Sequence, residues 1–254
     1  MSQRIIQGDS AIELKKFKDN SIDTIVTSPP YNLKGFRSSR GARGNQYRAS
    51  SLWKDSLFNY GTYDDDLDES EYRLQQIEFI NECHRCIKPT GSIFYQHKLR
   101  RWNAHSSHPV DWICRTKANF YQEIIWDRGG TIALDPHYLL PTTESIYWLT
   151  KQKPLVYRKK LPPAYRKTIW SIPLQRVPEH PAPFPVLLAR LCIQLATPAG
   201  GLVVDPYMGS GSTGMAAKEL GMKFTGIEMD KSYCEIARKR ISATREDKAH
   251  TLFE

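Results

Sequence analysis

The chain has no hydrophobic run that approaches the roughly 18 consecutive apolar residues of a membrane-spanning helix. Its first residues, Met1–Asp9, show no charged segment followed by an apolar one, so no secretory signal is expected. Cysteine is scarce, with five residues, and this odd number argues against a framework of disulfides. These absences predict a cytoplasmic protein in a reducing compartment, with no membrane partner.

Glycine and proline are too few for a fibrous or low-complexity protein, at 15 and 16 residues among 254. No internal repeat is visible. Hydrophobic residues make up 40% of the chain and charged residues 25%, which is ordinary usage for a globular protein. The length is enough to bury a core, and we expect residues 1–254 to form a single domain.

Acidic residues are missing from two segments that are rich in lysine and arginine. The whole chain has 36 basic and 27 acidic side chains, a formal net charge of +9. The two segments together carry more positive charge than this net value: Lys34, Arg37, Arg40, Arg43 and Arg48, then Lys151, Lys153, Arg158, Lys159, Lys160, Arg166 and Lys167. Such clusters are typical of surfaces that bind a polyanion, although a solvated surface has the same composition.

Short β-branched runs alternate with amphipathic segments, which predicts an α/β fold with an open, mostly parallel sheet. Strands are expected at 4–7, 23–27, 91–95, 120–126, 144–150, 201–205 and 223–228. Helices are expected at 11–17, 70–87, 185–196, 213–220 and 231–241, with Asp9 or Ser10 as the cap of the first. Residues 33–62 and 151–181 have no sustained period and are expected to be irregular.

A glycine-rich turn, DPYMGSGSTG, occupies residues 205–214 between a predicted strand and a predicted helix. Its glycines follow the G-x-G-x-x-G pattern and let the backbone approach a ligand closely: Gly209, Gly211 and Gly214. Glu228 ends the next strand, where a carboxylate can accept hydrogen bonds from ribose hydroxyls. A dinucleotide or S-adenosylmethionine satisfies this pattern. Asp205 favours the second, because its carboxylate repels a pyrophosphate and attracts an ammonium or sulfonium group.

Only one helix follows Glu228, so the strand next to it must come from elsewhere in the chain. The strand at 4–7 is the available candidate. Its trailing Gly8–Asp9 would then lie beside the adenine of the ligand, at the carboxyl edge of the sheet. The two ends of the chain are therefore expected to build one site.

The strand at 23–27 leads into Ser28-Pro29-Pro30-Tyr31. Two prolines fix the backbone and remove two donors, so their carbonyls are expected to be left as acceptors. This turn suits a planar amino group, such as that of adenine or cytosine in a flipped base, with Tyr31 stacked on it. If Ser28 and the Pro29 carbonyl accept both amino protons, the nitrogen lone pair is localised for attack on a sulfonium methyl. A plain Pro-Pro turn is the alternative interpretation.

Both motifs resemble those of a known family, the DNA amino-methyltransferases. Thr27–Tyr31 is similar to the family's catalytic motif and Asp205–Thr213 to its cofactor motif, with Met208 where the family usually has Phe or a similar apolar residue. The catalytic motif comes first, an order that resembles the β group. The resemblance therefore implies a circularly permuted, Rossmann-like methyltransferase sheet with helices on both faces.

The same resemblance implies S-adenosylmethionine as the cofactor, double-stranded DNA as the substrate and a cognate restriction endonuclease as a partner. It assigns catalysis to Ser28, Pro29, Pro30 and Tyr31. The expected cofactor residues, which include the segment 179–185 beside the methionine of the cofactor, are Asp9, Ser10, His180, Phe184, Asp205, Pro206, Met208, Gly209, Gly211, Ser212, Thr213 and Glu228.

Two regions are expected to contact DNA. The loop at 33–62 follows the catalytic motif directly, and the resemblance places target recognition in the interval of about 100–175, between the two motifs. The predicted DNA-binding side chains are Lys34, Arg37, Arg40, Arg43, Arg48, Arg158, Lys159 and Lys160. A plain surface loop is the alternative for each region.

Ser28 also bears on the target base, because serine at this position is commoner in the cytosine-N4 enzymes of the family than in the adenine-N6 enzymes. We therefore favour N4 of cytosine over N6 of adenine. RNA or protein-glutamine methyltransferases would share both motifs. A nicotinamide oxidoreductase would share only the glycine turn, and a non-catalytic DNA-binding module would transfer no methyl group.

The Cys83-x-x-Cys86 pair has no second pair at zinc-binding spacing and lies within the helix expected at 70–87. Packing in the core is the favoured interpretation of these cysteines, and no metal site is expected.

Overall fold

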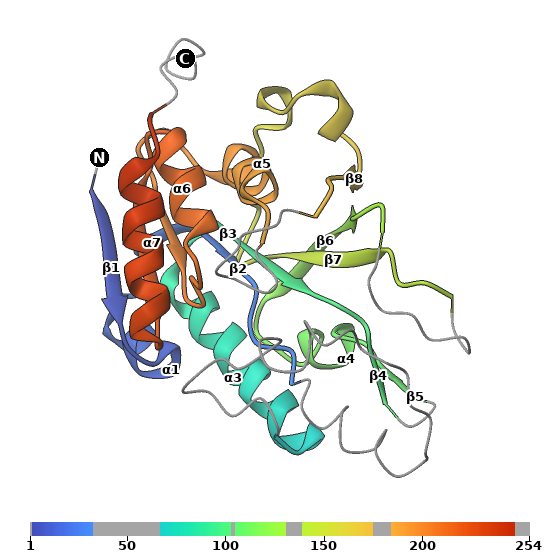
Figure 1. Cartoon of the computed structure of the whole chain (residues 1–254). Helices are drawn as coiled ribbons and strands as arrows, with labels where there is room; N and C mark the ends of the chain where they lie inside the picture. The colour runs from blue at the N-terminus through green and yellow to red at the C-terminus, as the bar shows by residue number, and fades with distance from the viewer. Residues whose placement is uncertain (1, 33–66, 103–104, 131–138, 175–183, 247–254) are drawn as a thin grey trace, which may run out of the picture.

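The computed structural model describes residues 2–32, 67–102, 105–130, 139–174 and 184–246. In these residues one sheet has the strand order β1-β10-β9-β2-β3-β7-β6-β8 (Figure 1). Its strands are β1 (Gln3–Gln7), β2 (Ile22–Thr27), β3 (Ile87–His97), β6 (Asn119–Asp127), β7 (Thr143–Thr150), β8 (Ile169–Ser171), β9 (Leu202–Asp205) and β10 (Lys223–Glu228). A separate hairpin consists of β4 (Arg100–Trp102) and β5 (His105–Ser107).

Five neighbouring strands, from β1 through β10, β9 and β2 to β3, run parallel to one another. Strand β7 is antiparallel to β3, and β6 is antiparallel to β7. The first strand of the chain pairs with one of the last, with Gln7 opposite Glu228. In Figure 1 the blue β1 accordingly lies beside the red α7. The expectation that both ends of the chain meet at one sheet edge is confirmed.

Helices cover both faces of this sheet. Helices α5 (Val186–Ala196), α6 (Ser212–Glu219) and α7 (Lys231–Ala243) bury one face. The other face is buried by α3 (Glu69–Cys86), α4 (Val110–Ile113) and the short turn η1 (Leu14–Lys16), which follows α1 (Ser10–Glu13). The buried side chains of each strand alternate between the two faces: Val26 packs with the first group and Ile25 with the second. This arrangement confirms the predicted α/β class with helices on both faces.

Two expected elements have other boundaries in the structure. The helix expected at 11–17 is the shorter α1 followed by η1, and the strand expected at 91–95 begins earlier. Helix α3 ends at Cys86 and β3 begins at Ile87, four residues before the strand expected at 91–95. Ile87 pairs with Ile22, and the register with β2 then shifts so that Thr24 pairs with Ser92. Pro89–Gly91 fall within this irregularity, where the missing N–H of proline breaks no ladder hydrogen bond.

The interval 100–175 is more regular than its sequence suggests. It contributes β6, β7 and β8 to the main sheet, together with the short helical turns η3 (Arg158–Lys160) and η4 (Pro163–Tyr165). The described part of this interval is therefore continuous with the sheet rather than set apart from it. Its role in target recognition stays a prediction.

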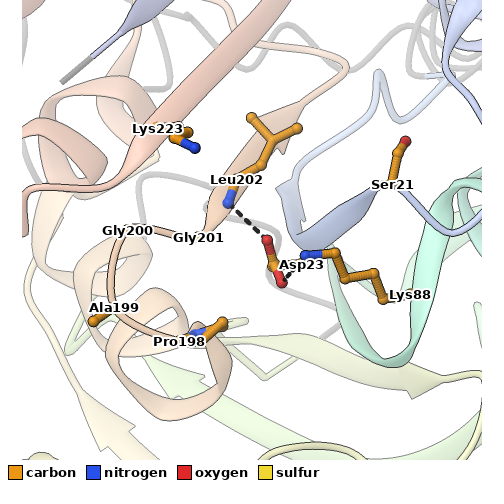
Figure 2. Close-up of a pocket in the computed structure, with 9 residues that line it drawn as sticks. All are labelled: Ser21, Asp23, Lys88, Pro198, Ala199, Gly200, Gly201, Leu202 and Lys223. Atoms are coloured by element: carbon orange, nitrogen blue, oxygen red, sulfur yellow. Dashed lines mark hydrogen bonds and ion pairs between the residues drawn. The ribbon is translucent and has the colours of Figure 1, made fainter.

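The amino-terminal edge of the parallel strands is held by Asp23. Its carboxylate accepts a hydrogen bond from the Leu202 N–H at 2.9 Å and pairs with the Lys88 ammonium at 2.7 Å. Figure 2 shows both contacts at the wall of a shallow hollow lined by Ser21, Asp23, Lys88, Pro198, Ala199, Gly200, Gly201, Leu202 and Lys223. One acidic side chain thus joins β2, β3 and β9.

Cys83 and Cys86 belong to α3 and point into the core. Burial raises the pKa of both thiols, that of Cys86 to about 11, so neither is a ready thiolate at neutral pH. This agrees with the interpretation as core packing. Among the described helices, none is long and apolar enough to cross a membrane.

Candidate active site

The glycine turn joins β9 to α6 at the carboxyl edge of the sheet. Gly209 and Gly211 have φ values of 50° and 86°, in the left-handed region. A Cβ at Gly211 would lie 2.9 Å from the Cβ of Ala237 on α7, so glycine is required there by space as well as by conformation. The sequence pattern therefore reflects real backbone constraints.

Asp205 lies at the start of this turn and is 4% exposed. Its carboxylate accepts hydrogen bonds from the Thr213 hydroxyl at 2.6 Å and the Tyr207 N–H at 3.1 Å. Burial raises the pKa of Asp205 to about 6. Both oxygens thus hold the turn in shape, and direct contact of Asp205 with a ligand stays a prediction.

Glu228 faces the same turn from the end of β10. Its two oxygens accept hydrogen bonds from the N–H groups of Gly209 at 2.8 Å and Asp230 at 2.9 Å. Burial raises the pKa of Glu228 as well. Within the described residues, no lysine or arginine forms an ion pair with Glu228 or Asp205. The turn therefore concentrates negative charge without a counter-ion from the described residues.

The end of β1 closes this site from the other side. The Gly8 N–H donates to the Glu228 carbonyl at 2.9 Å, and Asp9 caps α1 by accepting from the Ala11 N–H at 2.6 Å. The Ser10 hydroxyl donates to the Pro206 carbonyl. Ser10 is thus engaged in joining α1 to the glycine turn, while Asp9 lies at the carboxyl edge as predicted.

Three more of the predicted cofactor residues lie in or near the glycine turn or α5, and all three are at least partly buried. Met208 is buried against Gly226 of β10, where any side chain would collide with its sulfur. The Ser212 hydroxyl is buried at the start of α6 and has no hydrogen-bond partner among the described residues. Phe184 packs, partly buried, against the core near α5. His180 lies outside the described residues.

These features fit a ligand that carries ribose hydroxyls and positive charge. Hydroxyls can donate to Glu228, the unpartnered Ser212 oxygen is available to a polar ligand atom, and the uncompensated carboxylates favour cationic groups. A pyrophosphate would add negative charge beside two acidic side chains. The donor and acceptor set therefore fits S-adenosylmethionine better than a nicotinamide dinucleotide.

The Ser28–Tyr31 turn follows β2, the strand next to β9. The Ser28 hydroxyl lies 3.1 Å from the Tyr31 hydroxyl. Tyr31 in turn donates toward Gln96 Oε1 at 2.7 Å and lies 3.2 Å from Glu144 Oε2. Glu144 also pairs with Arg128 at 2.7 Å. The sequence did not reveal Gln96, Glu144 or Arg128 as members of this site.

Tyr72 of α3 and His97 of β3 contact the Ser28–Tyr31 turn from within the protein. The Tyr72 hydroxyl on α3 donates to the Pro30 carbonyl at 2.8 Å and lies 2.8 Å from Nε2 of His97. The Pro30 carbonyl is thus already engaged, in contrast to the expectation that both proline carbonyls are left open. The imidazole of His97 packs on the Tyr31 ring, with centroids 4.5 Å apart, and burial lowers the pKa of His97 well below its ordinary value.

Gln96 and His97 are polar residues at the carboxyl end of an apolar strand, a position that in parallel sheets often faces a ligand. That signal could have found them. Glu144 lies near the beginning of an antiparallel strand, so the same rule gives no signal for it.

Asn32 fixes the place where the basic loop leaves the turn. It adopts φ of 55°, which asparagine tolerates, and its amide exchanges two hydrogen bonds with the backbone of Leu67, at 2.8 and 2.7 Å. The chain therefore leaves and returns at one point beside Ser28–Tyr31. The predicted DNA-binding residues Lys34, Arg37, Arg40, Arg43 and Arg48 lie between these two points, outside the described residues.

The second predicted group, Arg158, Lys159 and Lys160, does not join the site. These residues form the exposed turn η3, and the preceding Tyr157 N–H donates to Leu195 near the C-terminal end of α5. That end leads back to the start of β9, so it lies at the amino-terminal edge of the sheet, opposite the catalytic turn (Figure 1). This placement does not support contact with DNA that reaches Ser28.

A family model described as "DNA methylase", for N6 and N4 methyltransferases, matches residues 22–239. The chain belongs to this DNA methylase family. The methylase is 28% identical to the Type II methyltransferase M2.DpnII of Streptococcus pneumoniae, across 95% of this chain and 90% of that protein. It is 27% identical to the DNA adenine methyltransferase YhdJ of Escherichia coli K12, across 99% of this chain and 86% of that protein.

Among solved structures, the methylase is similar to the cytosine-N4-specific PvuII DNA methyltransferase. The TM-score is 0.74 at 19% identity, with 99% of this chain and 90% of that one covered. This likeness confirms the predicted methyltransferase fold. Membership of the family makes the chain an S-adenosylmethionine-dependent methyltransferase that acts on DNA, as the two sequence motifs predicted. The nicotinamide and non-catalytic alternatives are thereby set aside.

Proposed function

We propose that this methylase modifies the N4 amino group of cytosine in double-stranded DNA. The pair of acceptors at the end of β2 carries the assignment of an amino group as the target. Cytosine is favoured over adenine by Ser28, a residue commoner in the cytosine-N4 enzymes of the family, and by the similarity to a structure named cytosine-N4-specific. The Ser28 hydroxyl and the Pro29 carbonyl lie on a rigid turn next to the negatively charged glycine turn of β9. A planar amino group bound between them has both of its protons accepted by the protein.

The chemistry consists mainly of positioning. When bound, S-adenosylmethionine would supply a methyl group on a sulfonium, and its sulfur would keep the electron pair of the broken S–C bond as a neutral thioether. Ser28 and Pro29 hold the amino protons, so that the nitrogen lone pair is directed at the methyl carbon and forms the N–C bond. The methylated nitrogen is then positively charged, and it becomes neutral by releasing one proton to solvent water. The rigid Pro29–Pro30 backbone supplies this geometry without reorganisation.

The other predicted residues have supporting roles in this proposal. Glu228, Asp9 and the Ser212 hydroxyl hold the cofactor, Asp205 and Thr213 shape its turn, and Met208 and Phe184 line it. Tyr31, supported from behind by His97, stacks on a flipped base. The arginines of 37–48 contact the DNA backbone, because their loop begins and ends beside the catalytic turn.

Methylation of adenine N6 is the second candidate, and the similarity to a protein named a DNA adenine methyltransferase favours it. Ser28 can accept a proton from either amino group, so the turn alone is compatible with both bases. A cognate restriction endonuclease remains a prediction, consistent with the similarity to a protein named a Type II methyltransferase.

One experiment separates these candidates. The protein is incubated with methyl-labelled S-adenosylmethionine and duplex DNA, and the DNA is digested to nucleosides. Label in N4-methylcytosine supports the proposal, and label in N6-methyladenine replaces it with the second candidate. RNA and a glutamine-containing protein are tested in parallel. Absence of label in DNA with wild-type protein, or full activity of Tyr31→Ala, would overturn the assignment of the site.

A further inference from the structure

A serine hydroxyl is both a donor and an acceptor, whereas the reaction proposed above needs Ser28 only as an acceptor. If the hydroxyl proton of Ser28 pointed at the bound base, it would compete for the same lone pair that must attack the methyl group. Something in the protein must therefore take up the Ser28 proton. The partners of Tyr31 determine where that proton goes.

The hydrogen-bond chain that reaches Ser28 begins at Glu144, which comes from the antiparallel strand β7. A carboxylate has only acceptors, so the amide of Gln96 must turn its NH₂ group toward Glu144 Oε2. Its Oε1 then faces Tyr31, at 2.7 Å from the phenolic oxygen. Gln96 is 2% exposed, so solvent does not offer it an alternative orientation.

Tyr31 therefore faces two acceptors, Gln96 Oε1 and Glu144 Oε2, and has a single proton to donate. With that proton directed at them, the Tyr31 oxygen can take part in its 3.1 Å contact with Ser28 only as the acceptor. Ser28 must donate its proton to Tyr31, and its lone pairs are turned toward the space in front of the turn.

Arg128 fixes the start of this chain. Its guanidinium donates to the other oxygen of Glu144, Oε1, at 2.7 Å, and to the Pro141 carbonyl at 2.5 Å. The side chains of Arg128 and Glu144 are 15% and 9% exposed. The carboxylate is thus held in one orientation by a partly buried ion pair, with Oε2 directed toward Gln96 and Tyr31.

We propose that Glu144 is a positioning residue that sets the direction of the Glu144–Gln96–Tyr31–Ser28 hydrogen-bond chain and so makes Ser28 a pure acceptor for the base amino group. The inference rests on the proposed function of Ser28. It assigns the Tyr31 hydroxyl a role separate from that of the Tyr31 ring. No proton needs to be transferred along the chain, because only the orientation of its hydroxyls is at issue.

The test uses Glu144→Gln, which keeps the size of the side chain but adds donors and so permits the reverse direction. We expect kcat for DNA methylation to fall at least about tenfold, because the reacting groups lose their orientation. The KM and Kd for S-adenosylmethionine should stay within about twofold. The matched control is Glu123→Gln on the neighbouring β6, which should leave kcat, KM and Kd unchanged.

A double-mutant cycle distinguishes this role from a merely structural one. Tyr31→Phe removes only the hydroxyl and should lower kcat by at least as much as Glu144→Gln. The double variant should be no slower than Tyr31→Phe alone, because both changes interrupt one chain. Multiplicative losses in the double variant, or a kcat of Glu144→Gln within twofold of wild type, would overturn the inference.

Failure of the proposed function and failure of the role of Glu144 give different results in these experiments. Wild-type protein that transfers no methyl group to DNA refutes the proposed function, whatever the variants do. Active wild-type protein with a fully active Glu144→Gln refutes only the role of Glu144. Should Glu144→Gln not fold, as judged by circular dichroism and cofactor binding, Tyr31→Phe decides alone: wild-type kcat without the hydroxyl overturns the inference, and a loss of kcat with intact cofactor binding supports it.

Discussion

Carboxylates withdrawn from solvent lie at both ends of the parallel strands, and the partners of these carboxylates differ between the two ends. At the amino-terminal edge, Asp23 is matched by the Lys88 ammonium and the Leu202 N–H (Figure 2). At the carboxyl-terminal edge, Asp205 and Glu228 receive only hydroxyl and N–H donors from the described residues, and burial raises the pKa of both. Asp23 therefore has a counter-ion, whereas no lysine or arginine of the described ranges pairs with Asp205 or Glu228.

The presence or absence of a paired cation therefore separates a structural carboxylate from one that is expected to bind a ligand. A buried carboxylate without a cation costs stability, because its charge is removed from water without compensation. A fold retains such a cost where a ligand supplies the missing charge. We predict that the ammonium or sulfonium of S-adenosylmethionine supplies that charge at the glycine turn.

The largest expected effect comes from Ser28→Ala at the carboxyl edge. Loss of one preorganised acceptor of the amino group should lower kcat for DNA methylation about 100-fold or more, with little change in thermal stability. The matched control is Ser21→Ala at the other end of the same strand, whose hydroxyl donates to the Lys18 carbonyl at the surface. Equal activity of the two variants would remove the distinction between the edges.

Asp205→Asn tests the uncompensated charge through pH. The pKa of Asp205 is raised from 3.8 to about 6, so between these values the folded protein holds a proton that the unfolded chain releases. The stability from this group is therefore present below about pH 4 and is lost as pH rises through about 6. Relative to the variant, wild-type protein should lose up to about 3 kcal/mol across this window, measured by urea unfolding at several pH values.

The control for this titration is Asp230→Asn. Hydrogen bonds from Ser232 lower the pKa of Asp230, so its contribution is present above its ordinary pKa and is lost as pH falls. Because that titration lies below about pH 4, the stability difference between wild type and this variant should be flat from pH 4 to 7 and should fall only at lower pH. A flat difference for Asp205→Asn from pH 4 to 7 would show that Asp205 is not an uncompensated buried acid.

Asp23→Ala probes the amino-terminal edge. It leaves the Leu202 N–H without its acceptor and should lower the free energy of unfolding by about 1–3 kcal/mol, while kcat of the folded protein stays unchanged. Asp19→Ala is the matched control. Its carboxylate is 67% exposed and pairs with Arg85 at the surface, so its removal should cost less than about 1 kcal/mol. A loss of kcat in Asp23→Ala would mean that this edge takes part in the reaction.

Some parts of the fold and of the site could be predicted from the sequence, and others could not. The glycine turn, Glu228 and the Ser28–Tyr31 turn were predictable because each depends on a short local pattern next to a strand. Asp23 and Glu144 were not, because their partners Leu202 and Gln96 lie far away in sequence and meet them only through strand pairing. The register shift before Ser92 and the pairing of β7 with β3 are tertiary features that no local period encodes.

The smallest effect concerns the basic residues, whose two groups the fold separates. Arg40→Ala with Arg43→Ala, in the loop whose ends meet at Asn32 and Leu67, should weaken DNA binding roughly tenfold and lower its salt slope by about two, since each phosphate contact contributes about 0.9. Lys159→Ala with Lys160→Ala, on η3 at the opposite edge, removes the same charge and should change neither quantity. Equal losses of DNA affinity in the two variants would mean that binding depends on net charge alone. The distance of a basic residue from the catalytic turn would then not determine whether it contacts DNA.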